Sequence, residues 1–122
     1  MKLFISILMI LHGIAHTVGF TTSWKLANPS GFKTTVFGGN VDLGEFGIRV
    51  TGVLWLLTGA AFVLLAIAWI TEQPWWSSLA WSAFVLSTLL TIIQWPEARI
   101  GIAVNASLAL ALLVYVKLEV AT

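Results

Sequence analysis

Four apolar segments, each long enough to cross a lipid bilayer as a helix, occupy most of this 122-residue chain. They cover approximately residues 3–20, 48–71, 75–95 and 100–118. A membrane-spanning helix needs about 17–25 apolar residues. Only the connection over residues 21–47 is long, so no separate soluble domain can form. The sequence therefore predicts one all-α domain over residues 1–122, an integral membrane four-helix bundle with a long first loop.

The composition supports a membrane protein, because 59% of the residues are hydrophobic and only 9% are charged. About a quarter of the residues are charged in a typical soluble domain. Lys2 before the first apolar segment also fits a signal peptide. Because three more apolar segments follow, we interpret it as the first transmembrane helix. The chain has no cysteine, which excludes disulfides and thiolate metal sites.

Charge gives a predicted orientation and argues against one class of partner. A net charge of +1 gives no reason to expect nucleic acid as a partner. Four spans place both termini on one side, together with Lys2 and Lys117. The other side, with the first and third loops, holds more basic residues: Lys25, Lys33, Arg49 and Arg99. The excess of basic residues predicts that the first and third loops are cytoplasmic.

The long first loop combines turn signals with apolar side chains. Asn28-Pro29-Ser30-Gly31 and Gly38-Gly39-Asn40 are both typical of turns. Phe32, Val36 and Phe37 lie close to them. Connections of this length are usually either functional lids or disordered segments. The apolar side chains favour a lid that folds over the mouth of the bundle.

Polar residues inside the apolar segments indicate a candidate site. His12 and His16 lie four residues apart and so share one face of a helix. Ionisable residues within a membrane usually face the bundle interior and mark functional sites. Ser87, Thr91 and Gln94 share one face of the third segment. Polar groups from all four segments are expected in the half of the bundle beneath the first loop. The residues that we predict to bind a ligand are His12, His16, Arg49, Thr91, Gln94 and Asn105.

Each of these polar residues also has a purely structural interpretation. Serine and threonine in helices commonly bond to the carbonyl of their own preceding turn, which accounts for Thr91 without a ligand. Asn105 can link two helices through hydrogen bonds. Arg49, at a helix end, can extend its guanidinium to the membrane surface. The two histidines on one inward face, with Asn105 and Gln94 at matching depth, are the hardest to explain in this way.

The residue types separate three kinds of site. His12 and His16 could share a metal ion, but a stable site needs three or four ligands and the apolar segments hold no acidic residue or cysteine. Haem with two axial histidines from different helices would require a second copy of the chain. A pocket for a small amphipathic molecule, with an apolar floor and His, Gln and Asn at its polar end, fits without further ligands.

Several motifs resemble those of a family of small bacterial four-helix membrane proteins. They are Leu11-His12-Gly13-Ile14-Ala15-His16 (the HGxxH sequence), Val18-Gly19-Phe20, Gly52-Val53-Leu54-Trp55-Leu56-Leu57, and Trp95-x-x-Ala98-Arg99-x-Gly101-x-x-x-Asn105. More distantly, Leu11-His12-Gly13 and Glu45 before the second apolar segment resemble the DoxX-like group. That likeness implies a four-helix protein of the bacterial inner membrane and a quinone-like ligand or an oxidoreductase partner.

These observations leave three functional hypotheses open. The first is a membrane protein that binds an amphipathic or quinone-like molecule, as an accessory to a redox system. The second is a structural or chaperone-like subunit of a larger membrane complex. The third is a haem- or metal-binding membrane oxidoreductase that uses His12 and His16. The expected partners are the lipid bilayer, a small hydrophobic ligand, and a second copy or a membrane complex. The sequence does not decide whether the protein is an enzyme.

Overall fold

The computed structural model describes residues 1–26, 32–95 and 98–121, and these are mostly helical. The elements in chain order are α1 (Lys2–Ala15), α2 (Thr17–Ser23), β1 (Thr35–Val36), β2 (Val41–Asp42), α3 (Gly44–Ile70), α4 (Trp76–Ile93) and α5 (Arg99–Ala121). The predicted all-α class is therefore confirmed, with one small two-stranded addition. Four helical segments are long and apolar enough to cross a membrane, with α1 and α2 together forming the first.

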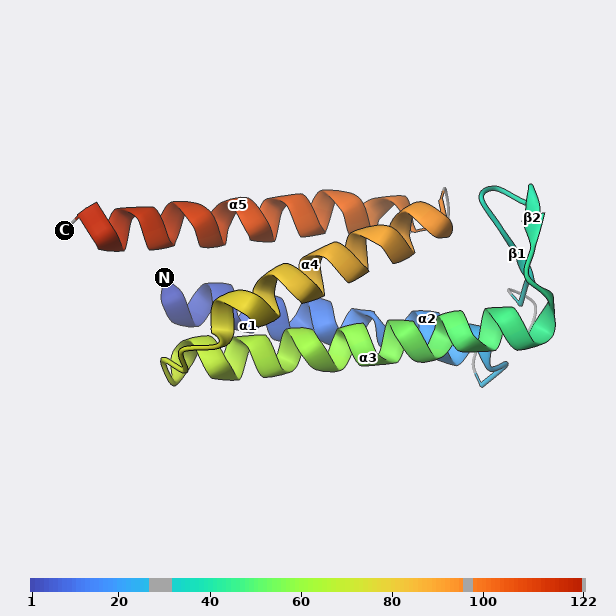
Figure 1. The fold of residues 1–122 in the computed structure, drawn as a ribbon, viewed down its shortest axis with the longest axis horizontal. Helices are drawn as coiled ribbons and strands as arrows, with labels where there is room; N and C mark the ends of the chain where they lie inside the picture. Colours follow the sequence, from blue (N-terminus) through green and yellow to red (C-terminus); the bar gives the residue numbers. More distant parts are fainter. Residues whose placement is uncertain (27–31, 96–97, 122) are drawn as a thin grey trace.

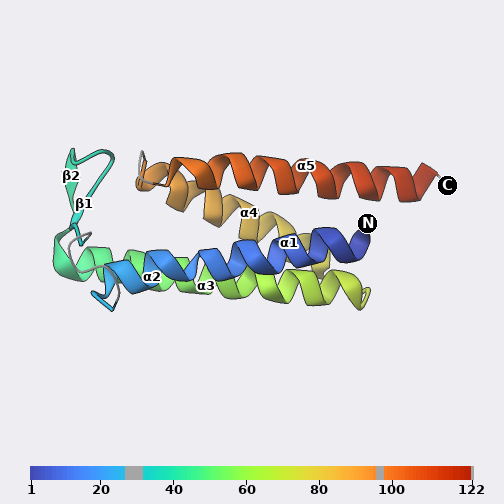
Figure 2. The same ribbon diagram turned by 180° about the vertical axis from the view of Figure 1, so that it is seen from behind.

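The four long helical segments run antiparallel to their neighbours in the chain, along one long axis of the molecule. In Figure 1 both chain termini lie at one end of the bundle and the β-hairpin lies at the other. α1 and α2 follow α3 along its length, as the view from behind shows (Figure 2). α4 packs between α3 and α5, and α5 also contacts α1. This antiparallel order follows from the short connections after α3 and α4.

The first predicted helix is interrupted at His16, where α1 ends and α2 begins. The Nδ1 atom of His16 lies 2.7 Å from the carbonyl oxygen of His12, one turn earlier. The backbone N–H of His16 shares its hydrogen bond between that oxygen, at 3.3 Å, and the Gly13 carbonyl, at 3.1 Å. The side chain thus competes with the backbone for the same acceptor, which loosens one turn without changing the direction of the chain.

Close packing of α1 against α3 depends on two glycines. A Cβ atom built at Gly13 would lie 2.6 Å from the Gly59 carbonyl oxygen, and one built at Gly59 would lie 2.5 Å from the Gly13 carbonyl oxygen. The two backbones therefore touch at this point, which is the typical use of small residues between membrane-type helices. This contact sets how near α1 comes to α3, and so where His12 and His16 lie.

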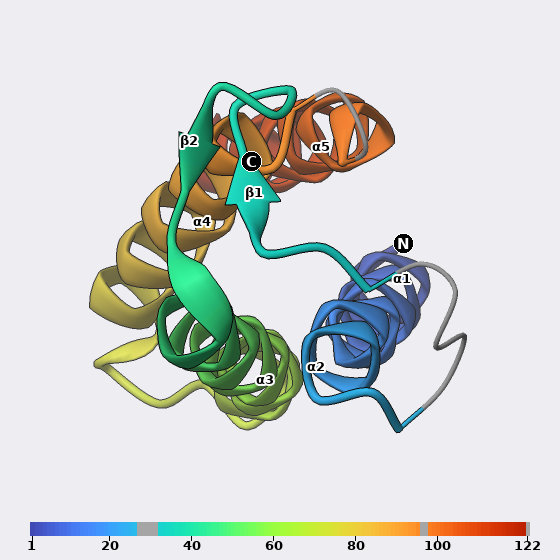
Figure 3. The ribbon, with the colours of Figure 1, turned by 90° about the vertical axis from the view of Figure 1, so that its right-hand side faces the viewer.

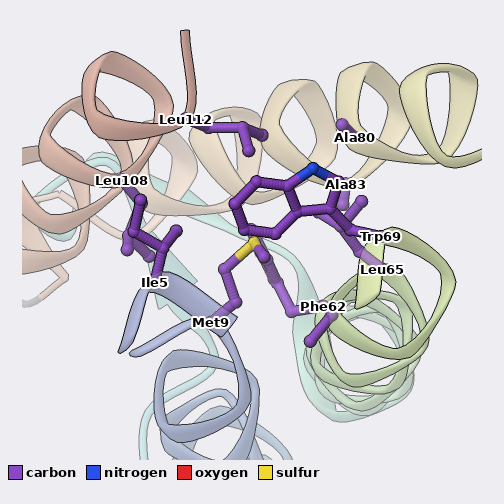
Figure 4. Packing of buried hydrophobic residues seen from close by; sticks show 10 residues of the cluster. Ile5, Met9, Phe62, Leu65, Trp69, Ala80, Ala83, Leu108 and Leu112 are labelled. Atoms are coloured by element: carbon purple, nitrogen blue, oxygen red, sulfur yellow. The ribbon is translucent and has the colours of Figure 1, made fainter. Parts of the chain in front are cut away.

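A buried apolar cluster fills the half of the bundle that holds the chain termini. Figure 4 shows how Met9 of α1, Trp69 of α3 and Leu112 of α5 approach one another at its centre. Met9, Phe62 and Leu65 are completely buried. Apart from Ser6, the polar residues of the bundle interior lie towards the middle and the hairpin end. One end of the bundle is thus a packed core, and the other is free to hold a site.

The β-hairpin is an element that the sequence analysis did not predict. Thr35 pairs with Asp42 and Val36 with Val41, around a turn in which Phe37, Gly38 and Gly39 all have positive φ. The predicted turn at Gly38-Gly39-Asn40 is therefore present, whereas the turn predicted at residues 28–31 lies outside the described residues. Phe37 donates its backbone N–H to the Ile93 carbonyl at 2.8 Å, which attaches the hairpin to the end of α4. Figure 3 shows the hairpin in front of the bundle end.

Asp42 fixes the junction between the hairpin and α3. Its carboxylate accepts the backbone N–H of Gly44 at 2.9 Å, and this bond, with one from the Thr34 hydroxyl, lowers the pKa of Asp42. A lowered pKa means that the junction is stabilised above the ordinary aspartate range, near about pH 4, and is weakened as the pH falls through the lowered value. We expect the protection factor of the Gly44 amide, which compares its exchange rate with the intrinsic rate at the same pH, to fall in acid in the wild type. Asp42→Asn should keep the acceptor and remove this pH dependence; equal pH dependence in both proteins would contradict the assignment.

Candidate functional site

Four buried side chains, from α1, its junction with α2, α4 and α5, form one hydrogen-bonded network. Nε2 of His12 lies 2.6 Å from Oδ1 of Asn105, and Nε2 of His16 lies 2.8 Å from Oγ of Ser87. Asn105 donates its amide to the Ser87 hydroxyl at 2.9 Å, which closes the network. The exposed fraction is 4% for Asn105 and zero for Ser87. The two histidines that are neighbours in sequence are thus held by partners that lie more than 70 residues further along the chain.

Three of the four imidazole nitrogens are engaged in the network, and their bonds can all form with both imidazoles neutral. His16 donates from Nδ1 to the His12 carbonyl and accepts the Ser87 hydroxyl at Nε2. His12 donates from Nε2 to Asn105, and this leaves Nδ1 of His12 as an acceptor. Within the described residues that Nδ1 has no hydrogen-bond partner. Of the four imidazole nitrogens, Nδ1 of His12 is therefore the one that can accept a bond from another molecule.

A cavity of about 380 Å³ lies in front of the two histidines, beneath the hairpin. Its polar lining comes from His12, His16, Thr91 and Gln94 inside the bundle, from Thr22 of α2, and from Lys33 and Thr35 on the hairpin side. Its apolar lining includes Ala15, Val18, Ile100 and Val104. Small-molecule sites usually have volumes of about 300–1,000 Å³ and largely apolar walls with a few convergent polar groups. Both the size and the lining of this cavity match that description.

Trp55 of α3 forms one wall of the cavity and orients Gln94. Its Nε1 donates to Oε1 of Gln94 at 2.6 Å, so the amide NH₂ of Gln94 is turned to other acceptors. Gly19 makes room for the indole, because a Cβ at position 19 would lie 2.5 Å from Cγ of Trp55. The ring of Trp55 also lies 5.1 Å from that of His16. An aromatic residue and a glycine thus shape the wall next to the histidines.

The structure brings five of the six predicted site residues together. His12, His16, Thr91 and Gln94 line the cavity, and Asn105 lies behind His12 as its support. Thr91 donates its hydroxyl to the Thr88 carbonyl of its own helix, at 2.8 Å, as the structural interpretation predicts. Its methyl group packs against Gly101.

Arg49 is not part of this group. Its guanidinium binds Glu45 of the same helix at 3.0 Å and lies 5.1 Å from the ring of Trp24. The physical reason is the i,i+4 spacing of Glu45 and Arg49, which lets the two side chains pair on one helix face. That spacing is visible in the sequence and was the signal against placing Arg49 in the site.

Three parts of the site were not among the predicted site residues. The sequence indicates Ser87 only as one member of a polar helix face, although it joins His16 to Asn105. Trp55 is a tryptophan among many apolar residues, and nothing in its own segment indicates that it faces Gln94. Thr35 reaches the cavity only because the hairpin folds over it. Each of these placements depends on how the helices pack.

The described residues offer little to a metal ion. No group of three or more His, Cys, Asp and Glu side chains that could hold a metal occurs among them. The ring nitrogens of His16 are both engaged, one by Ser87 and one by the His12 carbonyl. The arrangement suits an organic molecule that forms hydrogen bonds better than it suits a cation.

Comparisons with known proteins do not add to this picture. No protein family model matched the chain, and neither a curated protein nor a solved structure was found to be similar to it.

Proposed function

We propose that this is an integral membrane protein that binds a small amphipathic molecule in the cavity beneath the hairpin. The observation that carries the proposal is the cavity itself, about 380 Å³ in volume, with His12 and Gln94 at its polar end and apolar side chains around the rest. The histidine-bearing polar end is supported from behind by Asn105 and Ser87. Side chains held in this way are preorganised, so that binding does not have to order them.

The hydrogen-bonding groups in the cavity favour a head that carries both a hydroxyl and an adjacent acceptor. Nδ1 of His12 accepts a hydrogen bond, and the NH₂ group of Gln94 donates one. A hydroquinone ring meets both needs, because one hydroxyl can donate to His12 while a ring oxygen accepts from Gln94. No carboxylate is found among the described lining residues, so a neutral head is favoured over a cationic one. A quinone-like molecule is therefore the ligand class that we propose.

The exterior of the bundle supports a place within the bilayer. Large apolar side chains are exposed along every long helix, among them Leu11, Leu57, Leu89 and Leu110. Such surfaces are stable only against lipid or another protein. We propose that the hairpin end and the third loop face the cytoplasm, as the basic residues indicate. The resemblance to the DoxX-like group adds the proposal of a bacterial inner-membrane protein that assists a redox system.

A binding measurement with defined quinols tests this proposal. In lipid nanodiscs, wild-type protein should retain decylubiquinol, kept reduced under argon, as a stoichiometric complex in native mass spectrometry. Loss of one hydrogen bond is worth about 1 kcal/mol, so His12→Phe and Gln94→Leu should each weaken binding about fivefold to tenfold. Ser107→Ala is the matched control, because Ser107 is exposed and bonds only to the carbonyl of Ala103 on its own helix.

Two results would contradict the proposed ligand or its site. If wild-type protein in nanodiscs retains no decylubiquinol above the level of a protein-free nanodisc, the proposed ligand class is wrong. If His12→Phe, Gln94→Leu and Ser107→Ala all bind like the wild type, the ligand does not occupy this cavity. Either outcome would leave a structural role within a larger membrane complex as the better explanation of the buried network.

A further inference from the structure

We infer that the cavity opens sideways into the bilayer between α2 and the first turns of α5, and that the ligand binds with its head inside and an apolar tail in this opening. The inference rests on the proposed function and specifies the kind of ligand. It starts from two residues on opposite sides of the opening. Val18 of α2 and Ile100 of α5 both line the cavity, yet 63% of Val18 and 73% of Ile100 is exposed on the outer surface.

The packing of the helices explains why the bundle is open here. α2 packs along α3, whereas α5 packs on α4 and α1. The contacts of α5 with the first helical segment include the core cluster near the chain termini, to which Ile5 and Leu108 both belong. Within the described residues, α2 and α5 share no contact as extensive as these. The two helices therefore flank the hairpin end of the cavity without closing it.

The size of the cavity requires a route for any long tail. A cavity of about 380 Å³ lies near the lower end of the range of about 300–1,000 Å³ that is usual for small-molecule sites. A cavity of this size suits a substituted ring. We therefore infer that a long alkyl chain on the ring extends out of the cavity.

The lining residues show which exit suits an apolar chain. The wall towards α2 and α5 is mostly apolar, with Ala15, Val18, Ile100 and Val104, and Thr22 of α2 is its one hydroxyl-bearing residue among those described. Towards the hairpin the lining carries Lys33 and Thr35, and the hairpin is held on α4 by the bond from Phe37 to Ile93. The polar side of the cavity, which the hairpin covers, favours the polar head of the ligand. The apolar side between α2 and α5, which the hairpin does not cover, favours its apolar tail. Entry from within the bilayer, without passage through water, follows from the same arrangement.

Bulky substitutions at the opening test the inference. Val18→Trp and Ile100→Trp place a large ring where the tail should pass, while the polar end stays intact. We expect each to weaken decylubiquinol binding about tenfold, as a steric clash in a fitted site does. The same quinol ring without its decyl chain should bind these variants and the wild type equally. Leu11→Trp and Leu110→Trp are the matched controls, since both residues are exposed on the same helical rods, outside the cavity lining.

The two quinols, with and without the decyl chain, distinguish an error in the proposed opening from an error in the proposed binding site. If wild type binds decylubiquinol and the four tryptophan variants bind it equally well, the lateral opening is wrong and the site stands. If wild type binds neither quinol, the proposed function itself fails. Should a tryptophan variant not fold, Val18→Phe and Ile100→Phe carry the same test with a smaller expected loss. A loss shared by the ring-only quinol would also overturn the inference, because it would show a general disturbance of the cavity.

Discussion

A leucine at position 59 is expected to cause the largest loss of stability of any single change considered for this protein. Even a Cβ atom at this position would lie 2.5 Å from the Gly13 carbonyl oxygen and 3.1 Å from Cβ of His16. The obstacle is backbone, which cannot rotate away, so α1 and α3 must separate. We expect Gly59→Leu to lower the free energy of unfolding by about 3 kcal/mol or more, the upper end of the usual cost of overpacking.

Thermal unfolding in mild detergent, followed by circular dichroism, measures this effect. Ala60→Leu is the matched control, because Ala60 is the next residue of α3 and is exposed. It should change stability by no more than about 0.5 kcal/mol. Gly13→Leu should reproduce the loss seen at position 59, since the two glycines form one contact. A Gly59→Leu protein as stable as Ala60→Leu would show that α1 and α3 do not pack in this way.

Replacing Asn105 with leucine is expected to have the second largest effect, because it removes the hydrogen-bond acceptor of the buried His12 N–H. The Ser87 oxygen would also lose the bond that it accepts from Asn105, although its hydroxyl would still donate to His16. Buried polar groups left without partners cost about 1–3 kcal/mol each in water-soluble proteins, and interhelical bonds in membrane proteins average nearer about 0.6–2 kcal/mol. We therefore expect Asn105→Leu to cost about 2 kcal/mol, and to weaken ligand binding because His12 loses its orientation.

A double-mutant cycle distinguishes this network from general disruption of the helix. If His12 and Asn105 act together, His12→Leu combined with Asn105→Leu should cost less than the sum of the two single changes, because no unpaired N–H remains on His12. Ser107→Leu is the control on the same helix, two residues along on an exposed face, and should have little effect. Strict additivity of the two single changes would contradict the hydrogen bond between His12 and Asn105.

Much of the helical framework was predictable because apolar length alone defines it. The fourth segment was predicted at residues 100–118 and is found at Arg99–Ala121. The first was predicted at residues 3–20 and is found at Lys2–Ser23 across the interruption at His16. That interruption was not predictable, because the bond from the imidazole to the His12 carbonyl depends on a side-chain rotamer. The hairpin was also missed, since its two strands contain only two residues each, too few for a periodic pattern.

The candidate site was predictable in outline for a different reason. Polar side chains are conspicuous in apolar segments, and the similar depth of His16 and Asn105 below the same end of the bundle predicts that they share one region. The residue that bonds to Asn105 is His12, one turn deeper. The pattern of polar residues in the apolar segments does not give the rotation of each helix about its own axis. This rotation decides that Trp55 faces Gln94, that Ser87 joins the histidines, and that Asn105 lies behind the cavity wall. Arg49 had the right depth, but its local pairing with Glu45 took it elsewhere.

The central claim is that a ligand occupies the cavity and binds to the free ring nitrogen of His12. The chain has only two histidines, so nitrogen NMR of protein labelled with ¹⁵N-histidine observes both imidazoles. One spectrum of the His16→Gln variant is enough to assign the signals to His12 and His16. On saturation with decylubiquinol in nanodiscs, we expect the Nδ1 signal of His12 to move as it accepts a hydrogen bond, while both nitrogens of His16 stay in place. A spectrum in which His12 is unchanged while the quinol is bound, or in which His16 responds instead, would contradict the account.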